Sequence, residues 1–405
     1  MTVSRRSLLA TPALLLARPA VSQARFAGMD VKLGAIVPSS GPFAEWGRTN
    51  TVALRMVEEQ VNAGGGIGGA RLSIAIYDDA ARPAQAANLV RKLADDDKVL
   101  AIAGPLTSSA CEVAFPVANQ AKLVACSQAS SKPGTAAANR PWAFRNTIDE
   151  AVLLKTSLPW FKRSYSVETI AIIYDAKDAN SVALGSRIMP EMLKENGIRL
   201  LNEGSLATFN TGDIDVSAQV TALKALNPTA LVVAADYSQA VTVLREMRRQ
   251  GFIKPVIGGT PLISSAILRA APEIPVVSCA TYYAGQQGEK VQRFTNALQP
   301  RLRATAGLPP TIEPSMYDAH MAEIVGMYTD AVLRGGLTLK PADLESDREK
   351  LRAHLEKLSG YEGLSGPIHF AETGDAVKVF FTVVGQNGSW TEKVRGCSTH
   401  GSLTC

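Results

Sequence analysis

The sequence predicts an α/β protein made of two lobes, each built on a parallel β-sheet. Short apolar stretches alternate with amphipathic stretches of about 12–20 residues, which is the pattern of strands joined by crossover helices. The chain has 405 residues, enough for two or three domains. Near the end of the chain this alternation stops, and three helical stretches are followed by two strand-like stretches. Such a returning pair of strands can join a sheet formed earlier, so we expect the chain to cross between the lobes more than once.

In the first lobe the predicted elements follow a regular βα order. Residues 31–37 form a short and almost wholly apolar run, which favours a buried strand. Residues 44–62 place Val52, Met56 and Val61 on one helical stripe. The remaining elements expected here are strands at 71–77, 99–103 and 122–126 and helices at 83–96 and 108–120.

The second lobe repeats the same order. Apolar runs at 169–174 and 231–235 favour strands, and 181–195 and 238–250 have the length and periodicity of helices. A short strand is expected at 256–257. Toward the end of the chain we expect helices at 292–305, 316–333 and 348–358, and strands at 367–370 and 377–384 joined by a turn at 372–375.

The first 24 residues carry the features of a cleavable export signal. Arg5 and Arg6 precede a short apolar run at 10–17, and small residues stand at Ser22 and Ala24. The paired arginines followed by Ser-Leu-Leu resemble the twin-arginine type, which is read by a receptor that exports folded proteins. No later stretch approaches 18 uninterrupted apolar residues, so we expect a soluble protein in the periplasm.

The charge of the chain argues against a nucleic-acid partner. Lys and Arg number 42 against 37 Asp and Glu, a net charge of +5. Three of the basic residues lie in the first 24 residues, which contain no Asp or Glu, so the rest of the chain carries only +2. A nucleic-acid-binding domain has a concentrated basic face, and this chain has no such excess.

Catalytic and metal-binding motifs are missing from the sequence. It has four histidines and contains no HExxH, GxSxG or P-loop pattern. His320 and Asp318 are two positions apart, and residues at that spacing do not face each other on a helix. None of the five cysteines has the two-residue spacing of a zinc or redox site. We therefore expect no enzymatic activity, no metal and no cofactor.

A glycine-rich run at 64–69 matches the letters of the dinucleotide-binding fingerprint but not its context. That fingerprint needs a strand before the loop and a helix after it, so that the helix N-terminus meets the pyrophosphate. Here a predicted helix precedes the run and a predicted strand follows it. We expect these glycines to supply a helix end and a turn with positive φ angles.

Three loops rich in hydroxyl groups follow predicted strands of the first lobe, at 39–47, 104–109 and 127–131. The carboxyl ends of parallel strands share one edge of a sheet, where open α/β sheets bind ligands. Ser and Thr at the start of a helix also serve as ordinary caps. Three such loops on one edge, with an exposed aromatic expected at Trp46, favour a cleft that receives an anion or a carboxylate.

These segments resemble the periplasmic Leu/Ile/Val-binding proteins, the type I solute-binding components of ABC importers. In the first lobe the resemblance rests on the runs LGAIVPSSGPFAEWG, VNAGGGIGG, YDDAARPAQAANLVRKL and AGPLTSSA. Further along it includes ALVVAADYSQAVTVLREMRRQGF, MYDAHMAEI and YEGLSGPIHFAETGDAV. The runs keep the order of the family over nearly all of the chain that follows the leader.

The resemblance implies two Rossmann-like lobes joined by a three-crossover hinge, closing on a small ligand. It assigns residues 29–147 and 281–360 to the N-terminal lobe and residues 148–280 and 361–394 to the C-terminal lobe. Residues 395–405 remain as a tail.

The resemblance also implies which first-lobe residues touch the ligand. Hydroxyl and backbone groups around the paired serines and the later Ala-Ser pair would hold the ligand's carboxylate. Trp46 would pack against its side chain, which adds apolar contact with little loss of rotamer freedom. The residues expected in the cleft from the first lobe are Trp46, Ser108, Ser109, Ala129, Ser130 and Tyr317.

The second lobe departs from the family pattern. Where amino-acid binders carry a cleft tyrosine, this chain has Lys177 and Asn180, which would favour a more acidic or amide-bearing ligand. Where they place a glutamate for the ligand's ammonium, this chain has Thr260. A buried ammonium without a carboxylate partner is costly, so we expect Asp236 to take the place of that glutamate.

Together these features predict a non-enzymatic receptor that binds an amino acid of the branched-chain type, or a related small carboxylate, and delivers it to an ABC permease in the inner membrane. Two alternatives stay open. One is a receptor for aromatic or aliphatic carboxylates or amides, and the other is a ligand-sensing subunit of the same fold. A monomer is expected, because both lobes must move freely.

Overall fold

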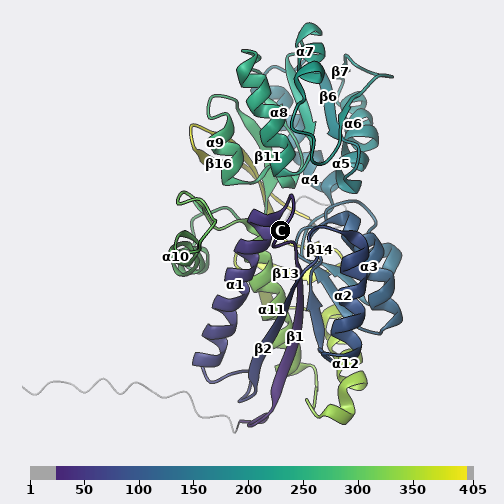
Figure 1. Ribbon diagram of the computed structural model, residues 1–405, viewed down its shortest axis with the longest axis vertical. Helices are drawn as coiled ribbons and strands as arrows, with labels where there is room; N and C mark the ends of the chain where they lie inside the picture. The colour runs from purple at the N-terminus through teal and green to yellow at the C-terminus, as the bar shows by residue number, and fades with distance from the viewer. Residues whose placement is uncertain (1–23, 399–405) are drawn as a thin grey trace, which may run out of the picture.

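A computed structural model describes residues 24–398, and Figure 1 shows two lobes stacked along the long axis. The first lobe is built on a parallel five-stranded sheet in the order β2-β1-β3-β4-β5. The export signal predicted for residues 1–24 lies, apart from Ala24, outside the described residues. The strands of this sheet are β1 (Asp30–Val37), β2 (Arg71–Asp78), β3 (Ala101–Ala103), β4 (Val124–Ser127) and β5 (Ala143–Arg145).

Helices cover both faces of the first sheet, because its strands present apolar side chains on each side. Leu33 and Leu72 point to the face covered by α1, α11 and α12, whereas Ile36 and Ile102 point to the face covered by α2 and α3. A further helix, α10, packs along α1. The bounds are α1 (Ala44–Ala63), α2 (Pro83–Asp95), α3 (Ser108–Gln120), α10 (Glu289–Arg303), α11 (Met316–Arg334) and α12 (Leu344–Glu356).

The second lobe is built on a mixed eight-stranded sheet. Its parallel part follows the order β11-β10-β9-β6-β7, with β8 also paired to β6. The late strands β15 and β16 add to this sheet antiparallel beside β11, which confirms that the chain returns to a sheet formed earlier. The bounds are β6 (Thr169–Asp175), β7 (Arg199–Leu200), β8 (Ala207–Phe209), β9 (Ala230–Ala234), β10 (Val256–Ile257), β11 (Val276–Ala280), β15 (Val379–Gln386) and β16 (Ser389–Cys397).

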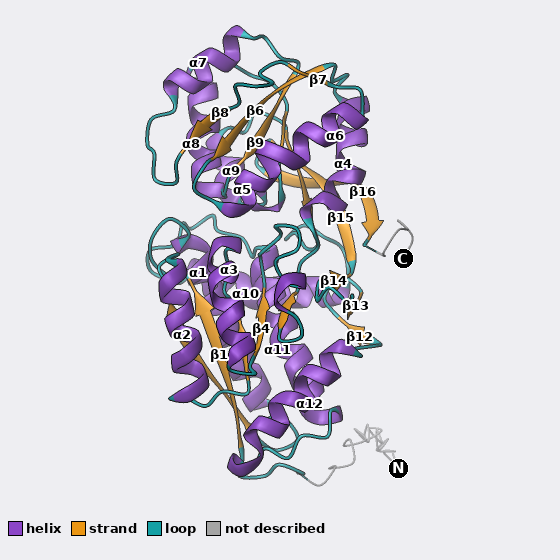
Figure 2. Ribbon diagram, turned by 90° about the vertical axis from the view of Figure 1, so that its right-hand side faces the viewer, coloured by secondary structure: helices purple, strands orange, loops and turns teal. Residues whose placement is uncertain are grey.

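Helices also cover both faces of the second sheet, as Figure 2 shows from the side. The helix predicted for 181–195 is interrupted by one wider π turn at Leu184–Ile188 and so counts as two helices, α5 and α6. One face packs against α4, α5 and α6, and the other against α7, α8 and α9. The bounds are α4 (Glu150–Ser164), α5 (Ala179–Ala183), α6 (Met189–Glu195), α7 (Ser217–Ala225), α8 (Tyr237–Arg249) and α9 (Ser265–Ala270).

A small antiparallel sheet of β12 (Tyr361–Glu362), β13 (Pro367–Phe370) and β14 (Ala376–Val377) packs against the first lobe. The ring of Phe370 lies 5.0 Å from that of Phe144, and both belong to the core of the first lobe. The division inferred from the resemblance placed residues 361–394 in the second lobe. Up to residue 377 the chain instead packs with the first lobe, because the apolar side chains of this hairpin meet their partners there.

The chain passes between the lobes at three places. The first is 146–149 between β5 and α4, the second is 281–288 between β11 and α10, and the third is Lys378 between β14 and β15. After the third crossing, β16 runs to Cys397, so residues 395–397 belong to a strand and not to the predicted tail. Residues 399–405 lie outside the described part of the chain.

A buried ion pair joins the first and third crossings to α11. Lys378 Nζ lies 2.6 Å from Glu323 Oε2, and both side chains are almost fully buried. Asn146 completes the group, because its amide nitrogen donates to Glu323 Oε2 at 2.8 Å and its amide oxygen accepts from Lys378 at 3.2 Å. Three polar side chains therefore satisfy one another where the chain changes lobes.

His320 ties the second crossing to the same region. Its Nδ1 lies 2.6 Å from the carbonyl oxygen of Gln128, and its Nε2 accepts a hydrogen bond from the hydroxyl of Thr281. Burial lowers the pKa of His320 to about 3, so the ring is neutral and its proton sits on Nδ1. His320 is therefore a buried residue that hydrogen-bonds to the second crossing at Thr281 and to Gln128.

The glycine-rich run forms a turn after α1 and before β2. Gly65, Gly66, Gly68 and Gly69 have positive φ angles, which confirms the turn predicted from their context. The next element after this run is the strand β2, so the run does not open a helix. None of the helices formed by residues 24–398 combines the length and apolar character needed to cross a bilayer.

Candidate functional site

The loop before α3 forms one wall of the cleft between the lobes. Thr107 caps α3, since its hydroxyl oxygen accepts from the backbone nitrogen of Ala110 at 3.1 Å and keeps its own hydrogen free to donate. The hydroxyl of Ser108, the first residue of the helix, lies 2.9 Å from that of Ser130. The positive end of the helix dipole points to the same place. This wall therefore favours a carboxylate or another anion.

Aromatic rings close the cleft beside this wall. Trp46 of α1 is only 3% exposed, so the aromatic expected at the surface is buried between the lobes. Its ring centroid lies 4.3 Å from that of Tyr237 in the second lobe and 4.7 Å from that of Tyr317 at the start of α11. The Trp46 ring thus bridges the lobes at the level of the hydroxyl-bearing loops, and it has apolar surface to offer a ligand.

Asp236 supplies the opposite wall. It caps α8, because its Oδ1 accepts from the backbone nitrogen and the hydroxyl of Ser238, each at 2.7 Å. Its other oxygen, Oδ2, is buried without a hydrogen-bond partner among the described residues. Burial raises the pKa of Asp236 to about 7, since an anion is poorly solvated there.

Two neighbours extend this acceptor wall. The amide oxygen of Asn180 is also buried without a partner among residues 24–398. Asp178 caps α5 through its Oδ2, which accepts from the backbone nitrogen of Ser181 at 2.8 Å. Burial raises the pKa of Asp178 as well. The second lobe therefore presents hydrogen-bond acceptors to the cleft, whereas the first lobe presents the Thr107 hydroxyl as a donor.

One pocket gathers these groups between the lobes. It contains side chains from the three hydroxyl-bearing loops of the first lobe and from the loops that open α5 and α8 in the second. Its lining residues are Phe43, Trp46, Leu106, Thr107, Ser108, Ala129, Ser131, Asp178, Asn180, Asp236, Pro261 and Tyr317.

Six of the ten residues predicted for the cleft line this pocket: Trp46, Ser108, Ala129, Asn180, Asp236 and Tyr317. The other four lie elsewhere. Ser109 accepts a hydrogen bond from the backbone nitrogen of Ala179 at 3.1 Å, across the lobe boundary. Ser130 lies behind Ser108, and Thr260 lies behind Pro261. Lys177 is exposed and lines a shallow depression outside this pocket.

The ten predicted residues leave out three polar residues that line the pocket, Thr107, Ser131 and Asp178, and a fourth that lies behind it, Glu150. Ser131, one position beyond the expected Ser130, lines the pocket. Its hydroxyl donates to Glu150 Oε2 at 2.7 Å, and Glu150 is fully buried behind the wall. The loop that contains Ser131 was predicted because it follows a strand. Nothing in the sequence shows that Ser131, and not Ser130, is the residue that lines the pocket. Nothing in the sequence marks Glu150, which comes to the site from the start of α4.

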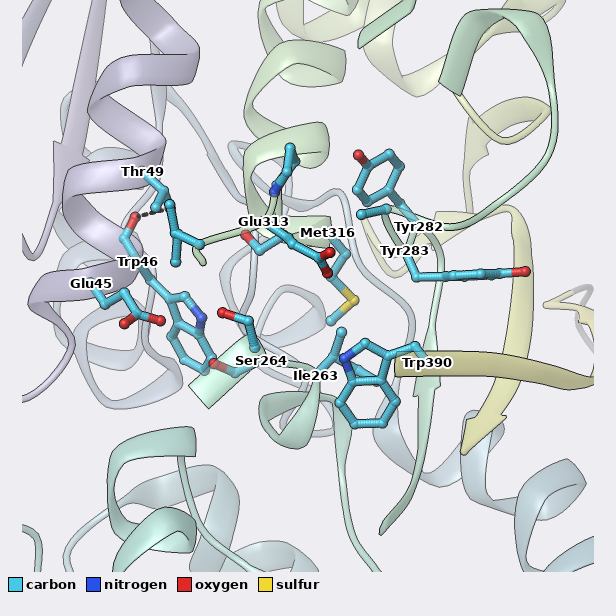
Figure 3. Close-up of a pocket in the computed structure, with 15 residues that line it drawn as sticks. Glu45, Trp46, Thr49, Ile263, Ser264, Tyr282, Tyr283, Glu313, Met316 and Trp390 are labelled. Atoms are coloured by element: carbon cyan, nitrogen blue, oxygen red, sulfur yellow. Dashed lines mark hydrogen bonds between the residues drawn. The ribbon is translucent and has the colours of Figure 1, made fainter. Parts of the chain in front are cut away.

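A second compartment lies on the other side of Trp46 (Figure 3). Its walls are mainly apolar, with Tyr282, Tyr283 and Met316 on one side and Trp390 from β16 on another. Glu45 stands beside Trp46, and burial raises its pKa. Its carboxylate lies 3.6 Å from the guanidinium of Arg269 in the second lobe. Trp46 thus lines both compartments of the same cleft.

The described residues contain no group of three or more His, Cys, Asp or Glu placed to hold a metal ion. The cleft instead has the composition of a site for a small polar molecule with an apolar part. Donors, acceptors and rings converge on it from both lobes, as is usual for ligand pockets between domains.

Comparison of the sequence with known proteins identifies a family. Residues 30–388 match the family described as periplasmic binding protein. The leucine-, isoleucine-, valine-, threonine-, and alanine-binding protein of Pseudomonas aeruginosa is 24% identical over 358 residues, which are 87% of this chain and 89% of that relative. An amino acid binding protein of the same organism is 26% identical over 222 residues, a match that spans 55% of this chain and 58% of that relative.

A solved structure agrees with this placement. The solute-binding protein of an ABC transporter from R. palustris, in complex with benzoate, has a TM-score of 0.78 at 15% identity. The match covers 93% of this chain and 99% of that one, and at this identity it concerns the fold alone. Since the family match extends over most of its length and its two-lobe fold agrees, the chain belongs to the periplasmic binding protein family.

Proposed function

We propose that this protein is the substrate-binding receptor of an ABC importer and that its ligand is an amino acid of the branched-chain type. The observation that carries the ligand class is Asp236 Oδ2, a buried oxygen that lines the cleft and has no partner in the described chain. A buried anion without a partner is costly, and a ligand ammonium would offset that cost.

The second-lobe wall suits a primary ammonium. Such a group has three N–H donors, and this wall has three acceptor side chains, Asp178, Asn180 and Asp236. The carboxylate of the same ligand would lie against Thr107 and Ser108 at the N-terminus of α3. A zwitterion thus has a complementary partner at each end.

An apolar side chain also has a place in the pocket. Phe43, Leu106 and Pro261 line it beside Trp46 and Tyr317. These side chains match a short aliphatic group, whose burial contributes about 0.8 kcal/mol per methylene. The relative from Pseudomonas aeruginosa that covers most of the chain is named for binding leucine, isoleucine, valine, threonine and alanine, which supports the same class.

An aromatic carboxylate is the second candidate. The rings of Trp46 and Tyr317 favour a flat ligand, and the structural neighbour from R. palustris holds benzoate. Its anion would take the place at Thr107 and Ser108, however, and leave Asp178 and Asp236 without a cation in the same pocket, since neither Lys nor Arg is among the residues that line it. Like charges at short range in a poorly hydrated site repel strongly. Amides, which bring N–H donors without a charge, would meet less repulsion.

The cellular role follows from the family. We propose that the protein works in the periplasm after export through its twin-arginine-like leader, as a monomer without enzymatic activity. An ABC permease in the inner membrane would receive the ligand. A ligand-sensing subunit of the same fold is the alternative role, and it would use the same cleft with a different partner.

Calorimetric titration of the mature protein tests the ligand class. The protein is unfolded and refolded to remove bound ligand and then titrated with leucine, 4-methylpentanoate, leucinamide and benzoate. Leucine should bind most tightly, because 4-methylpentanoate lacks only the ammonium and leucinamide lacks only the carboxylate charge. Tighter binding of benzoate or 4-methylpentanoate than of leucine would contradict an ammonium site at Asp236.

A further inference from the structure

Glu150 is a buried carboxylate that touches both lobes behind the pocket. It is the first residue of α4, directly after the first crossing, and it is fully buried. Its Oε2 accepts from the hydroxyl of Ser131 in the first lobe at 2.7 Å. In the second lobe, its Oε1 accepts from the backbone nitrogen of Thr260 at 2.8 Å, and its Oε2 accepts from the Thr260 hydroxyl at 3.1 Å.

The neighbouring loop leaves room for this carboxylate. A Cβ atom on Gly259 would lie 2.9 Å from the carboxylate carbon of Glu150, closer than real atoms approach. The glycine before Thr260 therefore allows the Glu150 head group to reach the Thr260 amide. The close approach of Glu150 is therefore the reason for a glycine at position 259. The backbone angle is not, because any residue adopts its φ of −76°.

The contacts of Glu150 fix the direction of the Ser131 hydroxyl. A serine hydroxyl has one hydrogen, and here that hydrogen is donated to Glu150. A carboxylate that receives three donors has none to return. Ser131 lines the pocket and can therefore offer it only an oxygen lone pair. Thr107, whose oxygen already accepts from Ala110, has the opposite polarity and offers a hydrogen.

We propose that Glu150 is a positioning residue that makes Ser131 a hydrogen-bond acceptor in the cleft and so selects ligands that carry N–H donors. This inference rests on the proposed function, and it adds a fourth acceptor to Asp178, Asn180 and Asp236. Glu150 acts through Ser131 and does not itself line the pocket. A ligand that has a carboxylate but no ammonium gains nothing from the oriented Ser131 oxygen.

Glu150→Gln tests this role with little change of shape. The amide oxygen of glutamine can accept from the Thr260 nitrogen, and its NH2 group then donates toward Ser131. The Ser131 hydrogen is released to point into the cleft, so its polarity is reversed. We expect the ratio of the affinities for leucine and 4-methylpentanoate to fall about tenfold or more in this variant, the size of one hydrogen bond to a charged group.

A double-mutant cycle separates this effect from a structural one. Ser131→Ala should also lower the ratio, and adding Glu150→Gln to it should cause no further change, because the group that transmits the effect is gone. Glu58→Gln is the matched control. Glu58 accepts from the backbone nitrogen of Ile74 at 3.0 Å in the first lobe and does not line the cleft pocket, so the ratio should stay as in the wild type.

The outcomes distinguish the two proposals. A wild type that binds neither leucine nor 4-methylpentanoate contradicts the proposed function, and the inference with it. A wild type that prefers leucine while Glu150→Gln keeps the same ratio overturns the role of Glu150 and leaves the proposed function intact. Additive effects in the cycle overturn it as well. Should Glu150→Gln fail to fold, Ser131→Ala provides the test by itself, and a Ser131→Ala variant that keeps the wild-type ratio overturns the inference.

Discussion

At the scale of single residues, the two carboxylate oxygens of Asp236 have different roles. Oδ1 caps α8, and Oδ2 has no partner in the described chain. Because burial raises the pKa of Asp236 to about 7, the ligand-free protein takes up a proton there as the pH falls through 7. The folded state then binds more protons than the unfolded state, so this site stabilises the ligand-free protein increasingly between pH 7 and 4.

The affinity for an ammonium ligand should change in the opposite direction. Only the ionised carboxylate attracts the ammonium, so we expect the affinity to be constant above pH 7 and to fall up to about tenfold per pH unit below it. Titration calorimetry with leucine from pH 5.5 to 8.5 measures this. An affinity that stays flat over that range would count against Asp236 as the ammonium partner.

Asp236→Asn isolates the charge. Asparagine caps a helix about as well as aspartate, so α8 should keep its start. We expect the variant to lose much of the pH dependence and at least tenfold in affinity for leucine at pH 8, while its ligand-free melting temperature at pH 8 rises because a buried charge is gone. Loss of affinity together with a lower melting temperature would indicate a damaged helix start instead.

The cleft residues that the sequence predicted share one property, which is their place at a strand end. Trp46, Ser108, Ala129 and Asp236 all follow strands, and the carboxyl ends of parallel strands meet at one edge. Glu150 had no such signal, because β5, the strand before it, was not predicted, and it reaches Thr260 from 110 positions away. Lys177 follows a strand too, but its side chain faces outward.

At the scale of elements, α1 is held against the loop that follows β1 by the absence of a side chain at Gly47. A Cβ atom there would lie 2.1 Å from the carbonyl oxygen of Pro38, which is backbone and cannot turn away. Gly47→Ala should therefore push the start of α1 outward and move Trp46. We expect a loss of about 1–3 kcal/mol in the free energy of unfolding, the usual cost of overpacking.

Gly64→Ala at the other end of α1 is the control for this prediction. Its added atom would meet nothing closer than 3.3 Å, and φ at Gly64 is −77°, which any residue adopts. Chemical denaturation of both variants and a leucine titration provide the readout. Equal losses of stability in the two variants would contradict the proposed contact with Pro38, and Gly47→Ala alone should weaken leucine binding.

The hinge depends on the ion pair between Lys378 and Glu323. Both side chains are almost fully buried, so removing one charge leaves the other without a partner. Lys378→Met should cost about 3–5 kcal/mol, and adding Glu323→Gln should recover part of that loss because the unpaired charge is removed. Denaturant midpoints of the two variants measure this. A double variant less stable than Lys378→Met would mean that other groups stabilise the Glu323 carboxylate when Lys378 is removed.

Elements that differ from the sequence prediction do so for identifiable reasons. The tail predicted from residue 395 begins inside β16, where Gly396 and Cys397 are buried because the strand continues its pairing with β15. The hairpin of β13 and β14 was expected in the second lobe because the division implied by the resemblance assigned residues 361–394 to that lobe. Which of two apolar cores a short hairpin joins is decided by contacts such as Phe370 on Phe144, and these are invisible in one sequence.

At the scale of the whole molecule, direct contacts between the lobes hold the cleft closed. The centroids of the Trp46 and Tyr237 rings lie 4.3 Å apart, Arg269 lies 3.6 Å from Glu45, and the Ala179 nitrogen donates to Ser109. Three hinge segments keep the lobes attached in any state. A ligand that touches both walls therefore needs to shift the balance between open and closed forms by only a few kcal/mol.

Tyr237→Ala should shift that balance toward the open form. Tyr237 packs on Trp46 from the second lobe but is not among the residues that line the pocket, so its loss acts on closure rather than on direct ligand contact. An aromatic pair contributes about 0.5–1.5 kcal/mol beyond its buried area, so leucine should dissociate a few-fold to about tenfold faster. Association, which begins from the open form, should change little.

Tyr165→Ala is the matched control for this last prediction. Tyr165 packs against the rings of Trp160 and Phe161 within the second lobe, so its removal costs stability without touching the lobe interface. Stopped-flow displacement of leucine should give the wild-type dissociation rate for Tyr165→Ala and a faster rate for Tyr237→Ala. If both variants release leucine at the wild-type rate, the ring contact between Trp46 and Tyr237 does not hold the cleft closed, and the hinge itself must set the closed form.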